Sequence, residues 1–318
     1  LKSLVLDEAD EMLDLGFKQD LDIIVNQSPK DKRILMFSAT IPKKILVLAS
    51  KYQKNAVRIE ATSLGKAHTD ISYETYLIKK HDVENAIFNF LRFHDDKTII
   101  IFCSTRSSVT HISSRILNRG FSVVSLSGAL NQSERFKALQ SIKNGRCKIC
   151  VATDVAARGI DLVNLDIVIH AELPQNSEIL IHRSGRTGRA GNKGRSILFC
   201  SPGEKRRYEK LISSAKVRPV INKFLSQEEI ELKDNEKIIN YLSRNQKNSS
   251  SELKFANELL SRFSNEDLAL ALIENFKGKL PPIEEVESLG EEQIIQMKND
   301  RKKKKRSKQN SRRNFRKR

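Results

Sequence analysis

The sequence contains no run of about 18 consecutive apolar residues among its 318 residues, so we expect no membrane-spanning segment. Cysteine is also scarce, with four residues in all. Two of them, Cys147 and Cys150, have CxxC spacing, but no second Cys or His pair accompanies them at the spacing of a zinc site. They lie in a strand-like stretch, where alternate residues face opposite sides of a sheet. We therefore interpret the cysteines as buried core residues in a reducing, cytoplasmic compartment.

A phosphate-binding loop of the form Gly-x-x-x-x-Gly-Lys-Ser/Thr is also missing. The first residue is Leu1 rather than Met, and an apolar stretch at residues 4–6 follows almost at once. Natural N-termini rarely begin in this way. We therefore expect the sequence to be the C-terminal part of a longer chain.

The positive charge of the chain is unevenly distributed. The net charge is +18, and residues 301–318 hold 12 of the 57 Lys and Arg residues and no acid. The rest of the chain then has 45 basic and 39 acidic residues and is only mildly basic. This distribution favours binding of a polyanion such as nucleic acid through its phosphates. The alternatives are a solvated tail without a specific partner and, in another cell type, a nuclear address.

Apolar stretches alternate with helix-length polar segments along the first two thirds of the chain. We predict strands at residues 4–6, 34–37 and 56–59, and then at 98–102, 123–126, 148–152, 167–170 and 196–199. Continuous apolar strands separated by helices are typical of a parallel sheet covered on both faces. The sequence therefore predicts an α/β fold.

The pattern of apolar and polar residues changes at about Pro219, where strand-like stretches end and apolar residues begin to recur at helical spacing. Residues 226–229 (Ser-Gln-Glu-Glu) form a capping-box pattern, and residues 253–276 carry apolar side chains at helical intervals. Such helices have more apolar surface than they can cover alone, so we expect them to pack on the preceding domain or on another chain. Beyond residue 280 the chain is acidic and then basic, which predicts disorder.

Acidic and hydroxyl side chains follow two of the first strands. Residues 7–10 (Asp-Glu-Ala-Asp) and residues 38–40 (Ser-Ala-Thr) each come directly after an apolar stretch. In an open parallel sheet, ligands bind beyond the carboxyl ends of the strands. Asp7 would hold hydrated Mg²⁺ on nucleotide phosphates there, and Glu8 would orient the attacking water. The alternatives are an exposed acidic turn and, for residues 38–40, a helix cap.

Two further polar segments belong to the second group of strands. Thr153 and Asp154 follow the strand at 148–152, and Gly159 a few residues later permits a tight backbone. Residues 182–189 (His-Arg-Ser-Gly-Arg-Thr-Gly-Arg) interleave three arginines with two glycines. Arginine binds phosphate oxygens through two parallel hydrogen bonds and stabilises charge that develops during phosphoryl transfer. The alternative is a basic surface loop.

In this order and spacing, these segments closely resemble the motifs of the DEAD-box RNA helicases over about residues 1–210. Residues 7–10 resemble motif II of that family. The other matches are residues 38–40 with motif III, 98–105 with motif IV, Gly128 with Gln132 and Arg135 with the glycine-plus-QxxR element, 152–161 with motif V, and 182–189 with motif VI. Ser184 is a departure, since an apolar residue is common at its position.

The resemblance implies a role for each matching residue. Asp7 would hold Mg²⁺ through water, Glu8 would position the attacking water, and the catalytic fingers that reach the γ-phosphate of ATP would be Arg186 and Arg189. Coupling between nucleotide state and domain closure is implied for Asp10, Ser38, Thr40 and His182. Nucleotide contact is implied for Asp154, Gly159 and Asp161. Contact with the RNA backbone is implied for Arg106, Gly128, Gln132, Arg135 and Thr153.

The resemblance also implies RecA-like parallel-sheet domains and a domain organisation. Residues 1–62 would be the C-terminal remnant of helicase domain 1, 63–72 a linker, 73–216 a complete helicase domain 2, 217–280 an α-helical dimerisation-like region, and 281–318 a disordered acidic-then-basic tail. More loosely, residues 219–280 resemble the dimerisation region of the bacterial cold-shock and ribosome-assembly branch. A homodimer through residues 217–280 would follow.

The implied function is ATP-dependent RNA unwinding, with ATP and Mg²⁺ as cofactors. RNA would be bound with little sequence preference, as single strands and short duplexes, in the cytoplasm and without a membrane. Because the phosphate-binding loop is missing, we expect the 318 residues alone to be inactive. One alternative is a non-enzymatic RNA-binding and dimerising module. A DNA helicase of a neighbouring superfamily is disfavoured by the Asp-Glu-Ala-Asp and His-Arg-Ser-Gly-Arg sequences.

Overall fold

The computed structural model describes residues 1–14, 16–38, 43–53, 55–59, 70–157, 165–189, 191–244 and 250–287. The chain divides into two compact units, residues 1–64 and residues 65–318, and each is described by itself. Several positions singled out above lie outside the described residues, namely Thr40, Gly159, Asp161, most of the expected linker 63–72 and the basic run 301–318.

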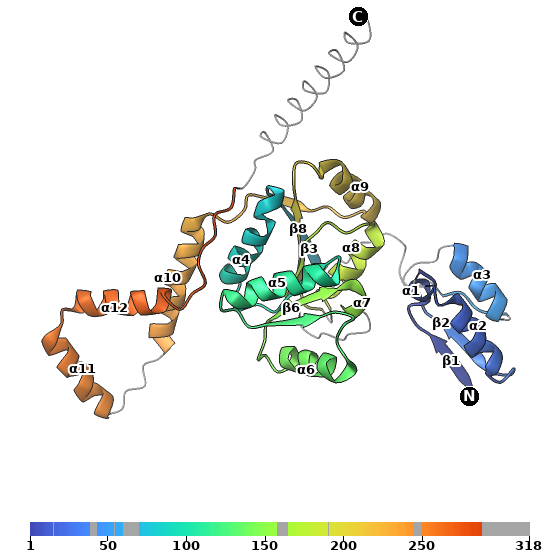
Figure 1. Ribbon diagram of the computed structural model, residues 1–318, viewed down its shortest axis with the longest axis horizontal. Coiled ribbons are helices and arrows are strands. Elements are labelled where there is room, and N and C mark those ends of the chain that lie inside the picture. The colour runs from blue at the N-terminus through green and yellow to red at the C-terminus, as the bar shows by residue number, and fades with distance from the viewer. Residues whose placement is uncertain are drawn as a thin grey trace, which may run out of the picture. The chain divides into compact units, whose positions relative to one another are not determined.

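The first unit is a small parallel pair of strands with helices packed on it (Figure 1). Strand β1 (Ser3–Leu6) pairs in parallel with β2 (Arg33–Met36). The helices are α1 (Ala9–Asp14), α2 (Lys18–Gln27) and α3 (Lys43–Tyr52). Leu6, Leu21 and Leu48 are each 3% exposed and form the centre of its core. The apolar spacing of α2 and α3 therefore buries one side of each helix against the strands.

The strand expected at residues 56–59 does not form, and that prediction is wrong. Val57 and Ile59 are each 83% exposed, and this segment is not part of either sheet. Alternation of apolar residues is not sufficient for a strand, because the backbone also needs a neighbouring strand to pair with.

The second unit is built around a seven-stranded, wholly parallel sheet in the order β5-β6-β4-β7-β8-β3-β9. The strands are β3 (Ile71–Leu77), β4 (Ile99–Cys103), β5 (Val123–Leu126), β6 (Ile149–Thr153), β7 (Ile167–His170), β8 (Gly194–Cys200) and β9 (Val220–Asn222). Because all strands run the same way, every carboxyl end lies at one edge of the sheet and every amino end at the other.

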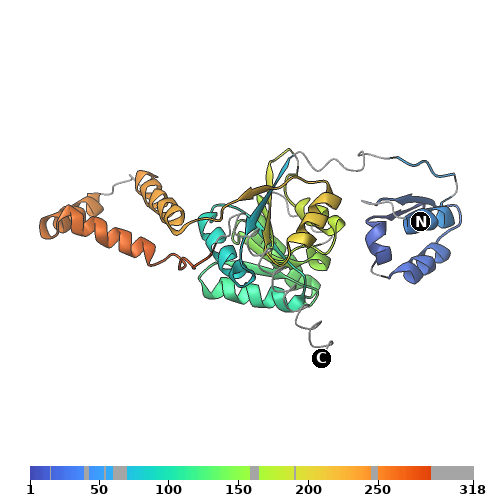
Figure 2. The same cartoon turned by 90° about the horizontal axis from the view of Figure 1, so that it is seen from above.

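Helices cover both faces of this sheet (Figures 1 and 2). One face packs against α4 (Val83–Phe93) and α5 (Arg106–Asn118). The other face packs against α6 (Gln132–Lys143), α7 (Asp154–Ala157), α8 (Ser177–Ser184) and α9 (Lys205–Ala215). The central strands are buried on both sides, as in β4, where every residue is at most 1% exposed. The predicted parallel α/β sheet is therefore confirmed.

The strands expected in the second unit agree closely with the observed ones, but two strands were missed. Those at 123–126 and 167–170 have the predicted bounds, and the others shift or extend by one or two residues. Polar residues hide β3 in the sequence, since Glu74 lies in the middle of the strand and is neutralised by Arg195 on the adjacent β8. The three-residue edge strand β9 was also missed because it follows Pro219, where we expected strands to end.

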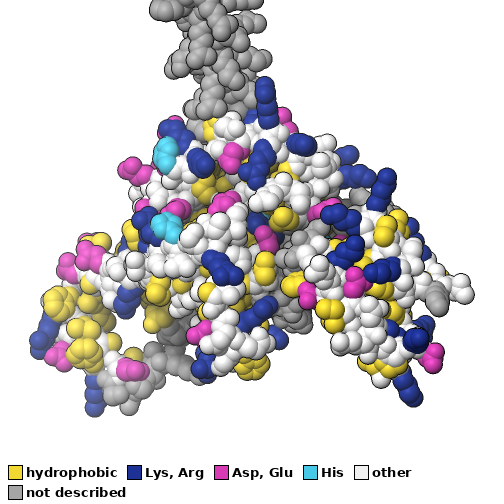
Figure 3. Space-filling view, turned by 45° about the vertical axis from the view of Figure 1, so that its right-hand side comes forward, with side chains coloured by type: hydrophobic (Ala, Val, Ile, Leu, Met, Phe, Trp, Pro, Cys, Tyr) yellow, Lys and Arg dark blue, Asp and Glu magenta, His cyan; other side chains and the backbone are white. Residues whose placement is uncertain are grey.

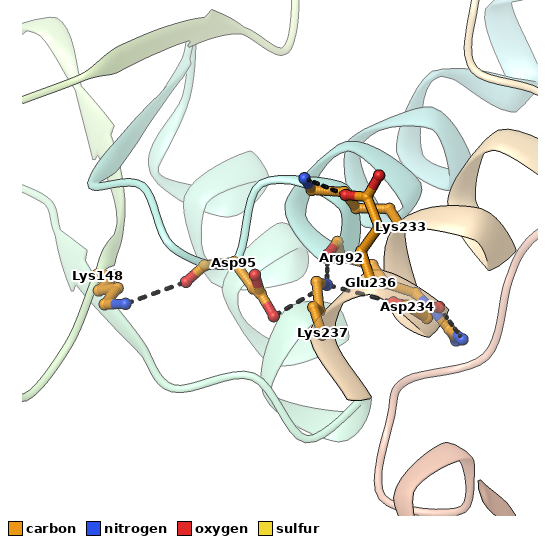
Figure 4. Close-up of polar contacts among 7 residues, drawn as sticks. All are labelled: Arg92, Asp95, Lys148, Lys233, Asp234, Glu236 and Lys237. Atoms are coloured by element: carbon orange, nitrogen blue, oxygen red, sulfur yellow. Dashed lines mark hydrogen bonds and ion pairs between the residues drawn. The ribbon is translucent and has the colours of Figure 1, made fainter. Parts of the chain in front are cut away.

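A helical extension follows the sheet, as predicted. It consists of α10 (Gln227–Arg244), α11 (Ser250–Arg262) and α12 (Asn265–Lys277). Figure 4 shows how α10 is fixed to α4: Arg92 donates two hydrogen bonds to Asp234, of 2.9 and 2.7 Å, and both side chains are buried. Residues 281–287, which the sequence assigns to the disordered tail, lie against α4 and α5.

All four cysteines are buried and free, as the sequence predicts. Burial raises the pKa of Cys103 and of Cys200 to about 12, so both thiols stay protonated and unreactive at neutral pH. Among the described residues, no helix combines the length and the apolar character needed to cross a membrane.

Candidate functional site

The acidic turn at residues 7–10 lies at the carboxyl end of β1, where α1 begins. Asp7 is exposed, and its carboxylate accepts a hydrogen bond of 2.9 Å from the backbone N–H of Glu8. Glu8 has φ of 52°, a left-handed backbone that is uncommon outside glycine and that clusters at functional turns. Asp10 is only 6% exposed and faces the interior of the unit. The turn therefore presents Asp7 to solvent and holds Asp10 within the unit.

Backbone hydrogen bonds place the second polar segment beside this turn. The N–H of Ala9 donates to the carbonyl oxygen of Phe37 at 3.0 Å, so Ser38, the next residue, lies beside the acidic turn. The expectation that both segments meet at one sheet edge therefore holds for Ser38. Thr40 lies outside the described residues.

The acidic turn fits a metal only through water and phosphate. Within the described parts of the chain, no group of three or more His, Cys, Asp or Glu residues could hold a metal ion. Mg²⁺ prefers six oxygen ligands and commonly keeps several waters while bound by one or two carboxylates and substrate phosphates. The exposed carboxylate of Asp7 suits that kind of indirect binding.

In the second unit, three of the residues with an implied RNA contact lie at the carboxyl edge of the sheet. Arg106 begins the helix after β4, Gly128 follows β5, and Thr153 is the last residue of β6. These strands are neighbours in the order β5-β6-β4. A Cβ atom on Gly128 would lie 2.9 Å from Nη2 of Arg106, so the glycine leaves room for that side chain. The structure therefore brings Arg106 and Gly128 into direct contact.

The residues of that set differ in exposure. Arg135 donates a hydrogen bond of 2.9 Å to the carbonyl oxygen of Ala156, which ties α6 to α7. Thr153 is 8% exposed. Gln132 is exposed at the first turn of α6. Arg106 and Gln132 are thus open to a ligand, whereas Arg135 and Thr153 also serve the packing of the edge.

The arginine-rich loop, residues 185–189, lies at the opposite edge. Helix α8 starts near the carboxyl edge and runs back across the sheet, and the loop then contacts the amino ends of β7, β8 and β3. Thr187 Oγ1 donates to the carbonyl oxygen of Asp166 at 3.0 Å. Gly188, with φ of 66°, packs so closely that a Cβ atom would lie 2.7 Å from Ile71. The two predicted sets of residues are therefore separated by the length of the strands.

The arginines of this loop differ in exposure. Arg186 is half-buried, and Arg189 is exposed and donates a hydrogen bond of 2.8 Å to the carbonyl oxygen of Gly185. His182 lies half-buried on the last turns of α8. Gly188, two residues after Arg186, has a left-handed backbone that lets the chain turn, so one short loop presents two cations.

Arg183 is a buried charged residue to which sequence reasoning gave no role. It is 3% exposed and forms two hydrogen bonds with Asp154, of 2.6 and 2.7 Å. Its guanidinium also lies 5.2 Å from the ring centroid of Phe102. Arg183 therefore connects the carboxyl edge to the helix that carries the arginine loop. Both carboxylate oxygens of Asp154 are engaged, so a nucleotide contact at Asp154 would be shared with this ion pair.

The departure at Ser184 has a structural explanation. Its hydroxyl lies 2.7 Å from the carbonyl oxygen of Leu180 and 2.8 Å from Ser196 Oγ, which in turn lies 3.1 Å from His170 Nε2. All three polar side chains are fully buried. Burial, reinforced by the positive charge of Arg183, lowers the pKa of His170 well below its usual value, so the ring is neutral. A hydroxyl is stable at position 184 because two buried partners satisfy it.

Comparison with known proteins gives two family matches. Residues 1–48 match the DEAD/DEAH box helicase family, and residues 79–191 match the helicase conserved C-terminal domain. The ATP-dependent RNA helicase DbpA of Bacillus subtilis is 36% identical over 206 residues, which cover 65% of this chain and 43% of that protein. The ATP-dependent RNA helicase DeaD of Buchnera aphidicola is 37% identical over 238 residues, which cover 73% and 39%.

Solved structures give the same result. The S. cerevisiae protein Dbp5, bound to RNA and ADP BeF3, is 25% identical and has a TM-score of 0.66, with 74% of this chain and 63% of that chain covered. A variant of the same protein, also bound to RNA and ADP BeF3, is 27% identical with a TM-score of 0.63. The chain spans less than half the length of the curated relatives it matches.

Proposed function

Because the chain belongs to the DEAD-box RNA helicase family, we propose that the protein acts as an ATP-dependent RNA helicase that hydrolyses ATP on binding RNA and opens short duplexes. The observation that carries this proposal is the arginine loop at residues 185–189, which is fixed at one sheet edge by Thr187 and Gly188. A loop held in this way can present Arg186 and Arg189 to a phosphate without a large loss of entropy.

The acidic turn supplies the other half of the proposed ATP site. Asp7 would hold Mg²⁺ through water, and Glu8 would orient the attacking water. A bound Mg²⁺ would neutralise charge on the phosphates. Asp10, Ser38, Thr40 and His182 would couple the nucleotide to domain closure. The 318 residues contain no phosphate-binding loop, so hydrolysis would require such a loop in addition to them.

RNA would bind at the carboxyl edge of the second unit, where Arg106 and Gly128 lie together. Binding through phosphates and 2′-hydroxyls would give little sequence preference. The experiment that tests the function is ATP turnover of the full-length protein, measured with and without single-stranded RNA and with DNA of the same sequence. Stimulation by RNA alone is the expected result. Absence of RNA-stimulated turnover would leave only RNA binding, and equal stimulation by DNA would favour a DNA helicase.

The exposed apolar surface of the helical extension favours a second function for the protein, namely self-association. Figure 3 shows apolar side chains gathered over the extension at the lower left. Those exposed by about half or more include Leu232, Ile239, Phe255, Leu260, Phe263 and Leu270. We propose a homodimer through residues 217–280, because an exposed apolar surface of this kind is normally covered. Sedimentation analysis would then give a mass that rises with concentration, and Phe263→Glu would lower that mass whereas Lys254→Glu would not. A monomer at high micromolar concentration would contradict the proposal.

A further inference from the structure

The segment after α12 returns to the second unit and lies along α4, as the dark red trace beside that helix shows in Figure 1. We name residues 281–287 the strap. The strap forms no helix or strand, and its contacts are with side chains of α4, of the turn before α4 and of the end of α5. All of its own side chains are half-buried or exposed. The strap is therefore a segment docked on the domain rather than a part of its core.

A buried amide binds the backbone of the strap. Asn89 is 2% exposed, and its side chain accepts a hydrogen bond of 2.8 Å from the N–H of Glu284. The same side chain donates a hydrogen bond of 2.8 Å to the carbonyl oxygen of Glu284. Leaving a buried amide without partners is costly. The docked strap is therefore favoured over a released one at this position.

A charged pair fixes the same residue of the strap. Arg119, at the end of α5, binds the carboxylate of Glu284 through Nε at 2.7 Å and Nη2 at 2.6 Å. The guanidinium lies 3.8 Å from the ring centroid of Phe88. Val286 packs against the core two residues later. The strap thus has a polar anchor and an apolar anchor.

The first helix of the extension is attached to α4 only one turn away from the strap. Arg92, three residues after Asn89, binds Asp234 of α10. Lys237 of α10 also donates a hydrogen bond of 2.8 Å to the carbonyl oxygen of Arg92 (Figure 4). Residues three apart on a helix lie on the same side of it. The chain is therefore fixed to α4 at Asp234 and again at Glu284, so α4 closes the extension into a loop.

The part of the extension between these two points has little core of its own. No described side chain of α11 or α12 is buried. Helix α12 contacts α10 through Phe276, whose ring centroid lies 5.1 Å from that of Tyr241. Because α12 ends at Lys277, only a few residues before the strap begins, the strap fixes the end of this helix. Docking of the strap therefore restricts how α11 and α12 can move relative to α10.

We propose that docking of the strap holds the extension in the arrangement that binds a second copy of the chain. This inference rests on the proposed homodimer through residues 217–280, a range that does not include the strap. The closed loop leaves apolar side chains open to a partner, since Leu260, Phe263 and Leu270 are 53%, 52% and 59% exposed. A surface that is ordered before association loses less conformational entropy on binding. The strap is thus an intramolecular tether that favours the dimer without lying in its interface.

Docking of the strap is tested by hydrogen exchange in the full-length protein, measured on a peptide that covers residues 283–287. The wild type should be protected there, because the N–H groups of Glu284 and Glu287 are bonded to side chains. Protection should be lost in Glu284→Arg and in Arg119→Glu and regained in the double variant, which restores the charge pair. Glu285→Arg makes the same charge change at an exposed side chain one residue along the strap and should keep the protection.

The effect on self-association is tested by sedimentation of the same variants. Glu284→Arg and Arg119→Glu should each raise the dissociation constant of the dimer about tenfold, because α11 and α12 must then be ordered on association. The double variant should return to the wild-type value, and Glu285→Arg should not change it. Phe263→Glu separates the interface from the tether, since it should weaken the dimer while the strap stays protected.

Each part of the proposal can be overturned separately. An unprotected strap in the wild type would show that the strap is not docked. A released strap with an unchanged or lower dissociation constant would show that docking does not favour the dimer. A wild-type protein that stays monomeric would reject the proposed homodimer, and the tether role with it, whereas protection of residues 283–287 would still establish the closed loop.

Discussion

At the scale of single residues, the buried side chains determine how the candidate site is held together more than the exposed ones do. Arg183 and Asp154 are separated by 29 positions in the sequence, yet they form a bidentate pair in which the arginine side chain is 3% exposed and the acid 27% exposed. The pair is unequal in its environment. Loss of the acid would leave a buried positive charge, whereas loss of the arginine would leave a carboxylate that water can reach.

This asymmetry predicts different costs for the two deletions. Asp154→Ala should lower the free energy of unfolding of the second unit by about 3 kcal/mol, because it leaves the guanidinium of Arg183 buried without its partner. Arg183→Met should cost less, and the double variant should be more stable than Asp154→Ala alone. Urea denaturation followed by circular dichroism measures all three. Equal costs for the two single variants would contradict the proposed environment of the pair.

Stability should also depend on pH through His94. Burial lowers the pKa of His94 to about 4, with a further contribution from Arg195, while Asp96 and Glu74 oppose the shift and Lys97 adds to it. Arg195 also donates to His94 Nε2 at 3.2 Å, which requires an unprotonated nitrogen. His94 therefore becomes protonated near pH 6.5 in the unfolded state but only near pH 4 in the folded state. The free energy of unfolding therefore decreases as the pH falls below 6.5.

The expected slope is about 1.2 kcal/mol per pH unit between pH 6 and pH 4.5 for this histidine, and buried His170 adds to it. Urea denaturation at several pH values measures the slope, and His94→Asn should flatten it. A wild-type stability that does not change between pH 7 and pH 5 would show that His94 is solvated.

The sequence predicted those features of the candidate site that depend only on the type of a residue and on its position after a strand. Asp7, Thr153 and Asp154 lie at strand ends, as expected. The partner of Arg183 was not predictable, because a bidentate pair depends on how a helix crosses a sheet. The hydroxyl at Ser184 looked like a departure for the same reason, since its partner Ser196 lies on β8 and is in turn bonded to His170 on β7.

At the scale of elements, the fold places at opposite edges of the sheet two groups of residues that the motif pattern alone does not separate. All strand carboxyl ends meet at one edge, so the segments after β4, β5 and β6 were correctly expected to gather there. Residues 182–189 begin on α8, and this helix carries them toward the opposite edge, which a pattern of residue types does not reveal. Strands β3 and β9 were missed because polar residues and a preceding proline mask them, and pairing with their neighbours stabilises them instead.

The attachment of α10 is an element-scale feature with a clear test. Two of the ion pairs drawn in Figure 4 differ in burial: Arg92 of α4 with Asp234 of α10, which are 8% and 1% exposed, and Lys233 with Glu236, both on α10, which are 41% and 61% exposed. Asp234→Ala should cost about 3 kcal/mol and increase hydrogen exchange along α10, because it leaves Arg92 buried and unpaired. Lys233→Ala should cost less than about 1 kcal/mol. Equal effects of the two variants would contradict a buried attachment.

At the scale of the whole molecule, the proposed activity is divided between the two units. The acids that would act on ATP lie in residues 1–64, and the arginines lie in residues 65–318. Two side chains of α4 hold the helical extension near its two ends: Arg92 binds Asp234 of α10, and Asn89 binds the backbone of Glu284 after α12. The proposed catalysis therefore needs residues of both units, whereas the residues proposed to bind RNA all lie in the second unit.

The most direct test of the helicase proposal is ATP hydrolysis by the full-length protein and its Arg186→Ala variant at saturating single-stranded RNA. The wild type should show RNA-stimulated turnover. The variant should lose about a thousandfold or more of that rate, because an arginine finger stabilises charge on the transferred phosphoryl group. Its RNA affinity should stay unchanged, since Arg186 lies at the edge opposite the loops that are proposed to bind RNA. Turnover of Arg186→Ala at the wild-type rate would contradict the account.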